Sequence, residues 1–252
     1  VDNVAQLDGL SEGEIAAAKA AAEARDLQDQ WVLPLLNTSG QPSLAALTDR
    51  SLRERIFRAS VGRGSSGGEH DNRKIVAQIM KLRAERAKLL GYPNHAAFSL
   101  ENRTAKTTSA VNERLSALAP VAVANAKVEA AALQAVIAAE GEEFQLEPWD
   151  WAYYAEKLRA QKYAFDESEL KPYFELDNVL TKGVFFAAEK LYGITFKLRE
   201  DLPVYHDTVR VWEAFNADES VLALFVEDMY ARPSKRGGAW AMSYVSQSDL
   251  FG

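Results

Sequence analysis

Apolar residues recur every three or four positions along about the first two hundred residues, and this spacing predicts a mainly helical fold. Ser11 and Glu14 form a capping-box pattern, which predicts a helix that starts there and continues to about Asp26. Pro42 suits a first helical turn, and apolar positions recur from there to Val61. The pattern therefore predicts a further helix over residues 42–61.

Glycine, proline and capping residues divide the helical part that follows. The sequence GRGSSGG at Gly62–Gly68 predicts a flexible loop. Ile75, Ile79 and Leu82 recur at helical spacing and predict a helix that stops at Gly91, and Asn94 is expected to cap the next one. A long helix is predicted from Thr107 or Thr108 to Gly141, with a kink at Pro120. Two more are predicted over Trp149–Tyr163 and over Asn178–Tyr192, the second with a stop at Gly193.

The pattern changes after Gly193 to short runs of β-branched and aromatic residues. These runs are ITFKL, VRVWEAF and VLALFVEDMY, and Ala217–Ser220 separates the last two as a four-residue hairpin loop would. We therefore expect a mainly α fold, with a helical body over residues 1–193 and a small antiparallel β-sheet within 194–252. The sheet is expected to be incomplete, because no closing element follows Trp240–Val245.

Composition excludes several classes of protein. Hydrophobic residues make up 48% of the chain, which is typical of a globular protein. No uninterrupted run approaches about 18 apolar residues, so no membrane span is expected. The chain has no cysteine, which removes disulfides and thiolate chemistry, and the first residues lack the layout of a signal peptide. A cytoplasmic location is expected, and a periplasmic one stays open.

The net charge of −7 makes nucleic acid an unlikely main partner. Residues 50–88 have a positive net charge instead, with eleven Lys or Arg residues and four acidic ones. A charge run of this kind is most often a solvated basic helical face, and we expect one here.

The three histidines do not form a metal-binding pattern. His70, His95 and His206 all lie more than four residues apart, whereas a helical zinc site uses histidines at i and i+4. No H-E-x-x-H motif occurs, so no metal ligand and no catalytic residue is assigned.

Two polar or aromatic features are candidates for the lining of a cleft. In a strand that continues to Tyr230, Asp228 and Tyr230 share a face, while Glu227 points to the opposite one. The alternative is an ordinary strand end. In PWDWAYY, Trp151 and Tyr154 share a helix face, which is typical of a core and also of a groove wall.

The stretch SKRGGAW at Ser234–Trp240 allows three interpretations. Gly237, Gly238 and Ala239 are the three smallest side chains in a row, so another backbone can approach them closely. This favours a substrate-binding edge strand. A plain hairpin turn is the second interpretation, and a phosphate loop is the third and weakest, because no helix start follows the glycines.

Several segments together resemble the peptidyl-dipeptidases of the thimet oligopeptidase and oligopeptidase A family of zinc metallopeptidases. The matching segments are Trp31–Asn37, Leu90–Phe98, Pro148–Tyr154, Lys171–Leu180, Pro203–His206, Val209–Glu213 and Asp228–Trp240. The resemblance implies a two-lobed helical body with a deep channel. It also implies zinc held by an H-E-x-x-H helix and a later Glu, and release of dipeptides from peptide C-termini.

In that family the zinc ligands lie downstream of the double-glycine segment, so the resemblance assigns none of them to this chain. It implies a complementary C-terminal part carrying H-E-x-x-H as a partner, and an oligopeptide as substrate. Gly237, Gly238, Ala239 and Trp240 become the expected substrate-binding residues, because a peptide can add to a sheet edge as a strand. The alternative is a stand-alone helical module that binds a protein or RNA.

Overall fold

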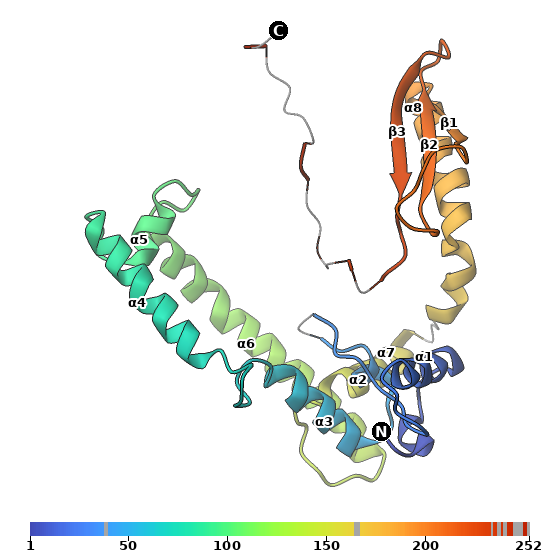
Figure 1. The fold of residues 1–252 in the computed structure, drawn as a ribbon. Helices are drawn as coiled ribbons and strands as arrows, with labels where there is room; N and C mark the ends of the chain where they lie inside the picture. The colour runs from blue at the N-terminus through green and yellow to red at the C-terminus, as the bar shows by residue number, and fades with distance from the viewer. Residues whose placement is uncertain are drawn as a thin grey trace. The chain divides into compact units, whose positions relative to one another are not determined.

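The computed structural model describes residues 1–37, 40–163, 167–232, 234–235, 238, 241–243 and 249–250. The chain divides into two compact units, Val1–Phe165 and Asp166–Gly252, which we call unit 1 and unit 2. Unit 1 contains helices, and unit 2 combines helices with the sheet (Figure 1). A mainly α fold with a small antiparallel sheet is therefore confirmed.

The described elements of unit 1 follow one another along the chain as short and long helices. They are the 3-10 helix η1 (Val4–Leu7) and the α-helices α1 (Glu12–Glu23), α2 (Ser43–Ala46), α3 (Arg50–Val61), α4 (Arg73–Leu89), α5 (His95–Leu100), α6 (Thr108–Ala139) and α7 (Trp151–Tyr163).

Three of the predicted helix starts are confirmed by their caps. Ser11 and Glu14 form the capping box at α1, in which the Ser11 amide donates to the Glu14 carboxylate at 2.9 Å. Asn94 accepts a hydrogen bond from the Ala97 amide at 2.9 Å and so caps α5. Thr107 caps α6. Each cap satisfies an amide that has no partner within its helix.

The helix predicted over residues 42–61 is wrong, because the structure divides this stretch into α2 and α3. Asp49 lies between them in an extended conformation and accepts a hydrogen bond from the Leu52 amide at 3.0 Å. It therefore caps a new helix. The carbonyls of Leu47 and Thr48 accept from Arg53 Nη1 at 2.8 and 3.1 Å, so this side chain satisfies the backbone at the break.

Unit 1 has two clusters of buried apolar residues. The first joins η1, α2 and α3, and its members are Leu7, Leu10, Leu44, Leu47, Leu52 and Ile56. The second joins α6 to α7, and its members are Leu133, Val136, Ile137 and Tyr154. Of the aromatic stripe found in the sequence, Tyr154 is therefore a core residue, whereas Trp151 is half-buried.

A buried carboxylate fastens α3 to the start of α7. Asp150 is completely buried and accepts from Arg53 Nη2 at 3.0 Å. It also accepts from Arg50 Nη2 at 2.8 Å. Arg53 is only 1% exposed, so the expectation of a solvated basic face is wrong at this position. Its charge is tolerated in the interior because the guanidinium is paired and hydrogen-bonded.

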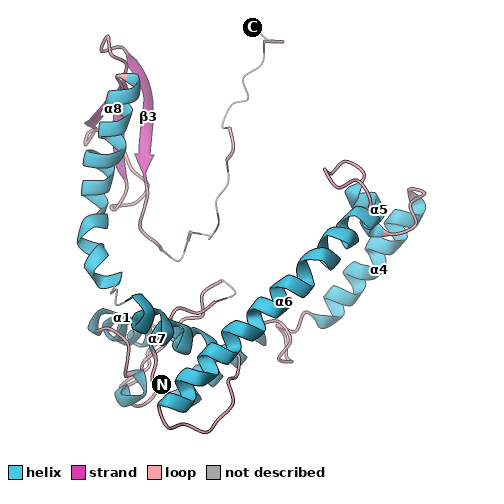
Figure 2. Cartoon of the chain, turned by 180° about the vertical axis from the view of Figure 1, so that it is seen from behind, coloured by secondary structure: helices cyan, strands magenta, loops and turns pink. Residues whose placement is uncertain are grey.

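Helix α6 spans 32 residues and contains Pro120 in its interior (Figure 2). By length and composition it could cross a membrane, with a mean hydropathy of 1.4 over its most apolar window, of which 17% is buried. The sequence criterion of an uninterrupted apolar run missed this helix, because charged residues such as Lys127 and Glu129 interrupt its many alanines. The expectation that the chain has no membrane span stays a prediction.

The described part of unit 2 contains three short helical elements and three strands. They are the 3-10 helix η2 (Glu167–Phe174), the π-helix η3 (Asn178–Phe185), α8 (Phe186–Tyr192), β1 (Thr195–Leu198), β2 (Arg210–Phe215) and β3 (Val221–Glu227). The strands are antiparallel in the order β1-β2-β3. Gly193 ends α8 at φ +70, as its position in the sequence predicts.

The predicted hairpin loop is confirmed. The Asn216 amide donates to the Ser220 carbonyl at 2.9 Å and closes the loop between β2 and β3. Glu219 takes a positive φ of 65°, which such tight loops require. Phe215 pairs with Val221, so the register shifts by one residue next to the loop. The boundary expected at Gly193 marks the change from helix to strand within unit 2, and as a domain boundary it stays a prediction.

The continuous helix of η3 and α8 covers one face of the sheet (Figure 2). Phe185 stacks on Phe196 with ring centroids 4.0 Å apart. It also meets Trp212 edge to face at 4.9 Å and Phe225 at 6.1 Å. The predicted extent of this helix is confirmed, but its first half is π-helical, whereas the sequence pattern indicates a regular helix.

The Asp150→Asn variant should unfold at much lower urea concentration than the original chain. The buried Arg53 loses its charged partner, and breaking a buried ion pair costs about 3–5 kcal/mol. Urea unfolding followed by tryptophan fluorescence measures the change. Glu54→Gln is the matched control, because it removes the exposed pair with Arg58 from the same helix. An equal shift of the urea midpoint in both variants would contradict the larger contribution of the buried pair to stability.

The Phe185→Ala variant should lose about 2–4 kcal/mol of stability, since one ring makes three aromatic contacts with the sheet. Phe186→Ala is the control, because this neighbouring ring is 54% exposed and should matter little. Thermal unfolding monitored by circular dichroism compares the two. If the control were the more damaging change, the described packing of the helix on the sheet would be wrong.

Candidate functional site

Polar side chains gather at the end of the sheet where β3 stops. Glu227 is the last residue of β3, is 3% exposed, and accepts from Arg210 Nη2 at 2.6 Å. It also accepts from Trp212 Nε1 at 2.9 Å. Arg210 forms a second ion pair with Asp177. The hydrogen bonds that Arg210 donates to Glu227 and then to Asp177 raise the pKa of its guanidinium, so this cation stays charged.

Asp228 follows directly and collects three donors of its own. Arg232 donates to both carboxylate oxygens, at 2.6 and 2.8 Å. Lys235 Nζ lies 3.2 Å from Oδ1, and the Tyr205 hydroxyl donates to Oδ2 at 3.0 Å. The Arg232 hydrogen bonds above all, assisted by Lys235 and Tyr205, hold the pKa of the Asp228 carboxyl well below its usual range. The same contact with Asp228 raises the pKa of Tyr205.

We call these eight residues the strand-end network. Its members are Asp177, Tyr205, Arg210, Trp212, Glu227, Asp228, Arg232 and Lys235. Seven of them come from four segments singled out in the sequence, namely Lys171–Leu180, Pro203–His206, Val209–Glu213 and Asp228–Trp240, and Glu227 directly precedes the last of these. Segments that are far apart along the chain therefore meet at one end of one small sheet.

The predicted site residues fall partly within the described chain. Gly237, Ala239 and Trp240 lie outside the described residues. Gly238 is described and has φ +108, a backbone conformation that residues other than glycine rarely adopt. A glycine is therefore required at this position by its backbone, and this φ differs from the negative φ of a regular β-strand.

The geometry assumed for Asp228 and Tyr230 is wrong. Strand β3 ends at Glu227, so these two residues do not share a strand face. Tyr230 is 58% exposed, and its carbonyl accepts from Lys235 Nζ at 2.9 Å. The strand ends there because this lysine and Arg232 engage the following residues. Whether the two side chains line a cleft stays a prediction.

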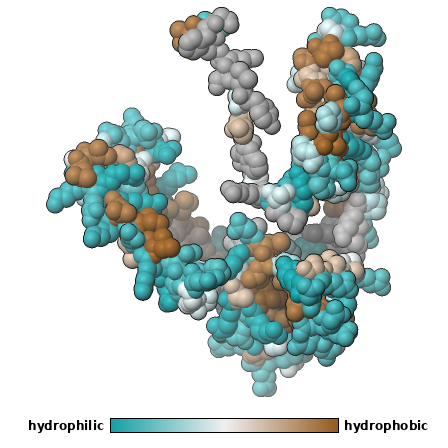
Figure 3. All heavy atoms as spheres, viewed as in Figure 1, coloured by the Kyte–Doolittle hydropathy of each residue, from teal (hydrophilic) through white to brown (hydrophobic). Residues whose placement is uncertain are grey.

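On the face of the sheet away from the helix, the side chains of β3 are apolar, whereas Lys197 and Glu213 of the neighbouring strands share this face. Leu222, Leu224 and Val226 alternate along β3 on the side opposite Phe225, and each is about half exposed. Figure 3 shows apolar side chains gathered over the strands of unit 2. In the described part of the sheet β3 is also an edge strand, with one side of its backbone unpaired. An apolar edge of this kind is normally covered.

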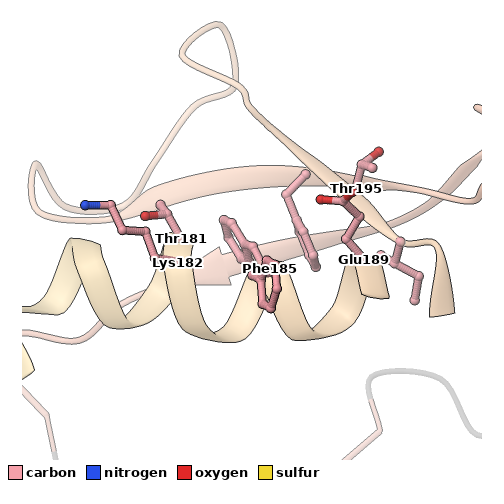
Figure 4. Close-up of a pocket in the computed structure, with 8 residues that line it drawn as sticks. Thr181, Lys182, Phe185, Glu189 and Thr195 are labelled. Atoms are coloured by element: carbon pink, nitrogen blue, oxygen red, sulfur yellow. The ribbon is translucent and has the colours of Figure 1, made fainter. Parts of the chain in front are cut away.

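A hollow of about 380 Å³ lies beside the same sheet, between the helix and β1 (Figure 4). Thr181, Lys182, Phe185 and Glu189 reach it from the helix, and Thr195 reaches it from β1. Its two charged side chains are exposed to solvent. It offers no buried polar group that would fix a ligand, and so it is a weaker candidate than the strand-end network.

The residues present do not fit a zinc site. His95 contacts Ser99, His206 contacts Thr208, and His70 lies beside Glu69, so each histidine has its own local partner. Across the described ranges, no three His, Asp or Glu side chains come together as metal ligands. The acids of the strand-end network are all paired with basic side chains. Chemically, this network can orient a backbone, whereas a general base needs a carboxylate that can take up a proton.

Sequence reasoning missed the Arg210–Glu227 pair and the buried Asp150. The first had a signal, because a four-residue loop at Ala217–Ser220 places Arg210 opposite Glu227 in the hairpin, as the observed register does. Asp150 and Arg53 lie 97 residues apart, and the pattern along the chain gives no indication of their contact.

Comparison with known proteins assigns the family. The family model described as "Peptidase family M3" matches residues 43–250. The chain is 46% identical to dipeptidyl carboxypeptidase of Escherichia coli over 99% of its own length, and 38% identical to oligopeptidase A of the same organism over 98%. It is 36% identical over 93% of its length to organellar oligopeptidase A of Arabidopsis thaliana.

The chain spans 37% of the length of each of the two bacterial relatives and 30% of the plant protein. The match nevertheless extends through both units and includes α6 and the segments that meet at the strand-end network. The resemblance found in the sequence is confirmed, and the chain belongs to peptidase family M3, a family of metallopeptidases.

Proposed function

We propose that this chain is part of a zinc-dependent peptidyl-dipeptidase, which releases dipeptides from the C-termini of oligopeptides. The observation that carries the proposal is the identity of 46% to a dipeptidyl carboxypeptidase, against 38% to an oligopeptidase A over nearly the same residues. Family membership also weighs against a stand-alone helical module that binds a protein or RNA.

The metal and the catalytic base would come from a complementary C-terminal part that carries H-E-x-x-H. The 252 residues contain no such motif, and the described histidines each lie in separate local contacts. Zinc would activate the water that attacks the peptide bond, and the Glu of the motif would accept its proton. The exposed apolar face of β3 supports a partner of this kind, because a covered apolar face stabilises a complex.

The role of this chain would be to form one wall of the channel and to bind the substrate backbone. A peptide that adds to a sheet edge is held by backbone hydrogen bonds, and small side chains leave the amides accessible. Gly237, Gly238 and Ala239 provide such a stretch, and Trp240 would wall a subsite. The paired charges of the strand-end network support a binding role. A cytoplasmic location stays a prediction.

A complex of this chain with a separately expressed part that carries H-E-x-x-H should hold one zinc ion and release C-terminal dipeptides. The substrate is a tetrapeptide with a blocked N-terminus, and mass spectrometry identifies the products. A chelator should abolish the release and added zinc should restore it, because the water is activated by the metal. Metal content is measured on the same sample.

The control replaces the Glu of H-E-x-x-H by Gln, which should keep the zinc and remove the activity. Cleavage inside longer peptides without release of dipeptides would reject the peptidyl-dipeptidase and favour an oligopeptidase. A stable complex that binds zinc and hydrolyses neither kind of peptide would reject the proposal altogether.

A further inference from the structure

We propose that Asp228 is a positioning residue for substrate binding, because its carboxylate holds Arg232 and Lys235 and so fixes where the chain leaves β3 toward Gly238. This inference rests on the proposed function, in which the glycine stretch binds the substrate backbone.

Lys235 is the part of this arrangement that holds the backbone. Its ammonium group donates to the carbonyls of Asp228 and Tyr230, at 2.5 and 2.9 Å, and lies 3.2 Å from the Asp228 carboxylate. An ammonium group has three hydrogens, and three acceptors lie within reach. Two of the first three carbonyls after β3 are thus bound by a side chain that stands three residues before Gly238.

Arg232 and Tyr205 hold the carboxylate from the other directions. Arg232 binds it through two nitrogens, a geometry that fixes orientation as well as distance. The same guanidinium donates to Ser234 Oγ at 3.2 Å and lies 5.6 Å from the centre of the Tyr205 ring. The Tyr205 hydroxyl then completes the set from the connection between β1 and β2. The described residues 228–232 and 234–235 are therefore tied to one another and to the connection between β1 and β2 at several points.

The substrate edge depends on this course, because Gly238 follows Lys235 by only three residues. If Asp228 loses its charge, Arg232 and Lys235 lose their common acceptor and the segment can take other paths. A peptide would then have to order the segment before it could bind, which lowers affinity and leaves the chemical step alone. Asp228 acts through its neighbours, so we expect no direct role in bond cleavage.

The first experiment measures dipeptide release by the complex with the complementary part, for the original chain and for Asp228→Asn. We expect KM to rise about tenfold and kcat to stay within about twofold, since only binding is affected. Arg232→Lys keeps the charge but loses the two-nitrogen contact, so its KM should lie between those of the original chain and of Asp228→Asn. Asp201→Asn is the control, because it breaks a more exposed two-nitrogen carboxylate pair, with Arg199, in the same unit.

The idea fails if Asp228→Asn leaves KM unchanged, lowers kcat instead, or behaves like the control. A second readout does not depend on activity. Hydrogen exchange of the peptide covering residues 228–238 in the 252-residue chain should quicken in Asp228→Asn and stay unchanged in Asp201→Asn. Unchanged exchange in both variants overturns the positioning role even if the complex is an active peptidase.

Carboxyl carbon NMR gives the pH dependence of the same contact. The pKa of Asp228 lies below that of an ordinary aspartate, so the contact is present at neutral pH and is lost only as the pH falls through this lowered value. Arg232→Gln should raise the pKa, and Arg199→Gln should leave it unchanged. An ordinary aspartate pKa in the original chain would contradict the arrangement.

If the complex releases no dipeptides while exchange and NMR behave as expected, the proposed function fails and the contact stands.

Discussion

A carboxylate that receives two basic side chains fastens each of the two units. In unit 1, Asp150 binds Arg50 and Arg53 and joins helices that lie about a hundred residues apart in the chain. In unit 2, Asp228 binds Arg232 and Lys235 and joins the end of β3 to the segment that follows. The chemistry is the same in both places, but the surroundings differ, and the difference decides what each group does.

Burial makes Asp150 a structural residue. Both this carboxylate and Arg53 are removed from water, so either one without the other would carry a large desolvation cost. Asp228 and Arg232 keep more contact with solvent, where individual ion pairs contribute little to global stability. What remains for the Asp228 contacts is local order, because three side chains, those of Arg232, Lys235 and Tyr205, converge on one carboxylate and restrict the path of a short segment.

The elements that could be predicted from the sequence are those fixed by near neighbours. Ser11, Asn94 and Thr107 cap the helices expected of them, because a cap needs only an amide two or three residues away. The hairpin loop followed from four turn residues between two strands. The break at Asp49 was missed, although aspartate is a strong cap, because the apolar spacing continues across it.

Contacts between distant residues set the limit of such reasoning. Nothing in the spacing of PWDWAYY distinguishes an exposed Asp150 from one that is completely buried, since its partners belong to another helix. The π-helical form of residues 178–185 is likewise invisible in a pattern that suits a regular helix. Of the candidate site, the pairing of Arg210 with Glu227 could have been predicted from the length of the hairpin loop, whereas the binding role of the glycine stretch stays a prediction. The convergence on Asp228 could not have been predicted.

The charge states of the strand-end network also bear on the division of labour in a peptidase. A general base works best when its pKa lies near the working pH, and the Asp228 carboxyl has been moved in the opposite direction by Arg232. Glu227 is committed to Arg210 and Trp212. An Asp228 carboxylate held in this way keeps its charge and its position at neutral pH. Proton transfer would then fall to groups outside this network, and a loss of Asp228 would be felt in how peptides bind before it is felt in how they are cleaved.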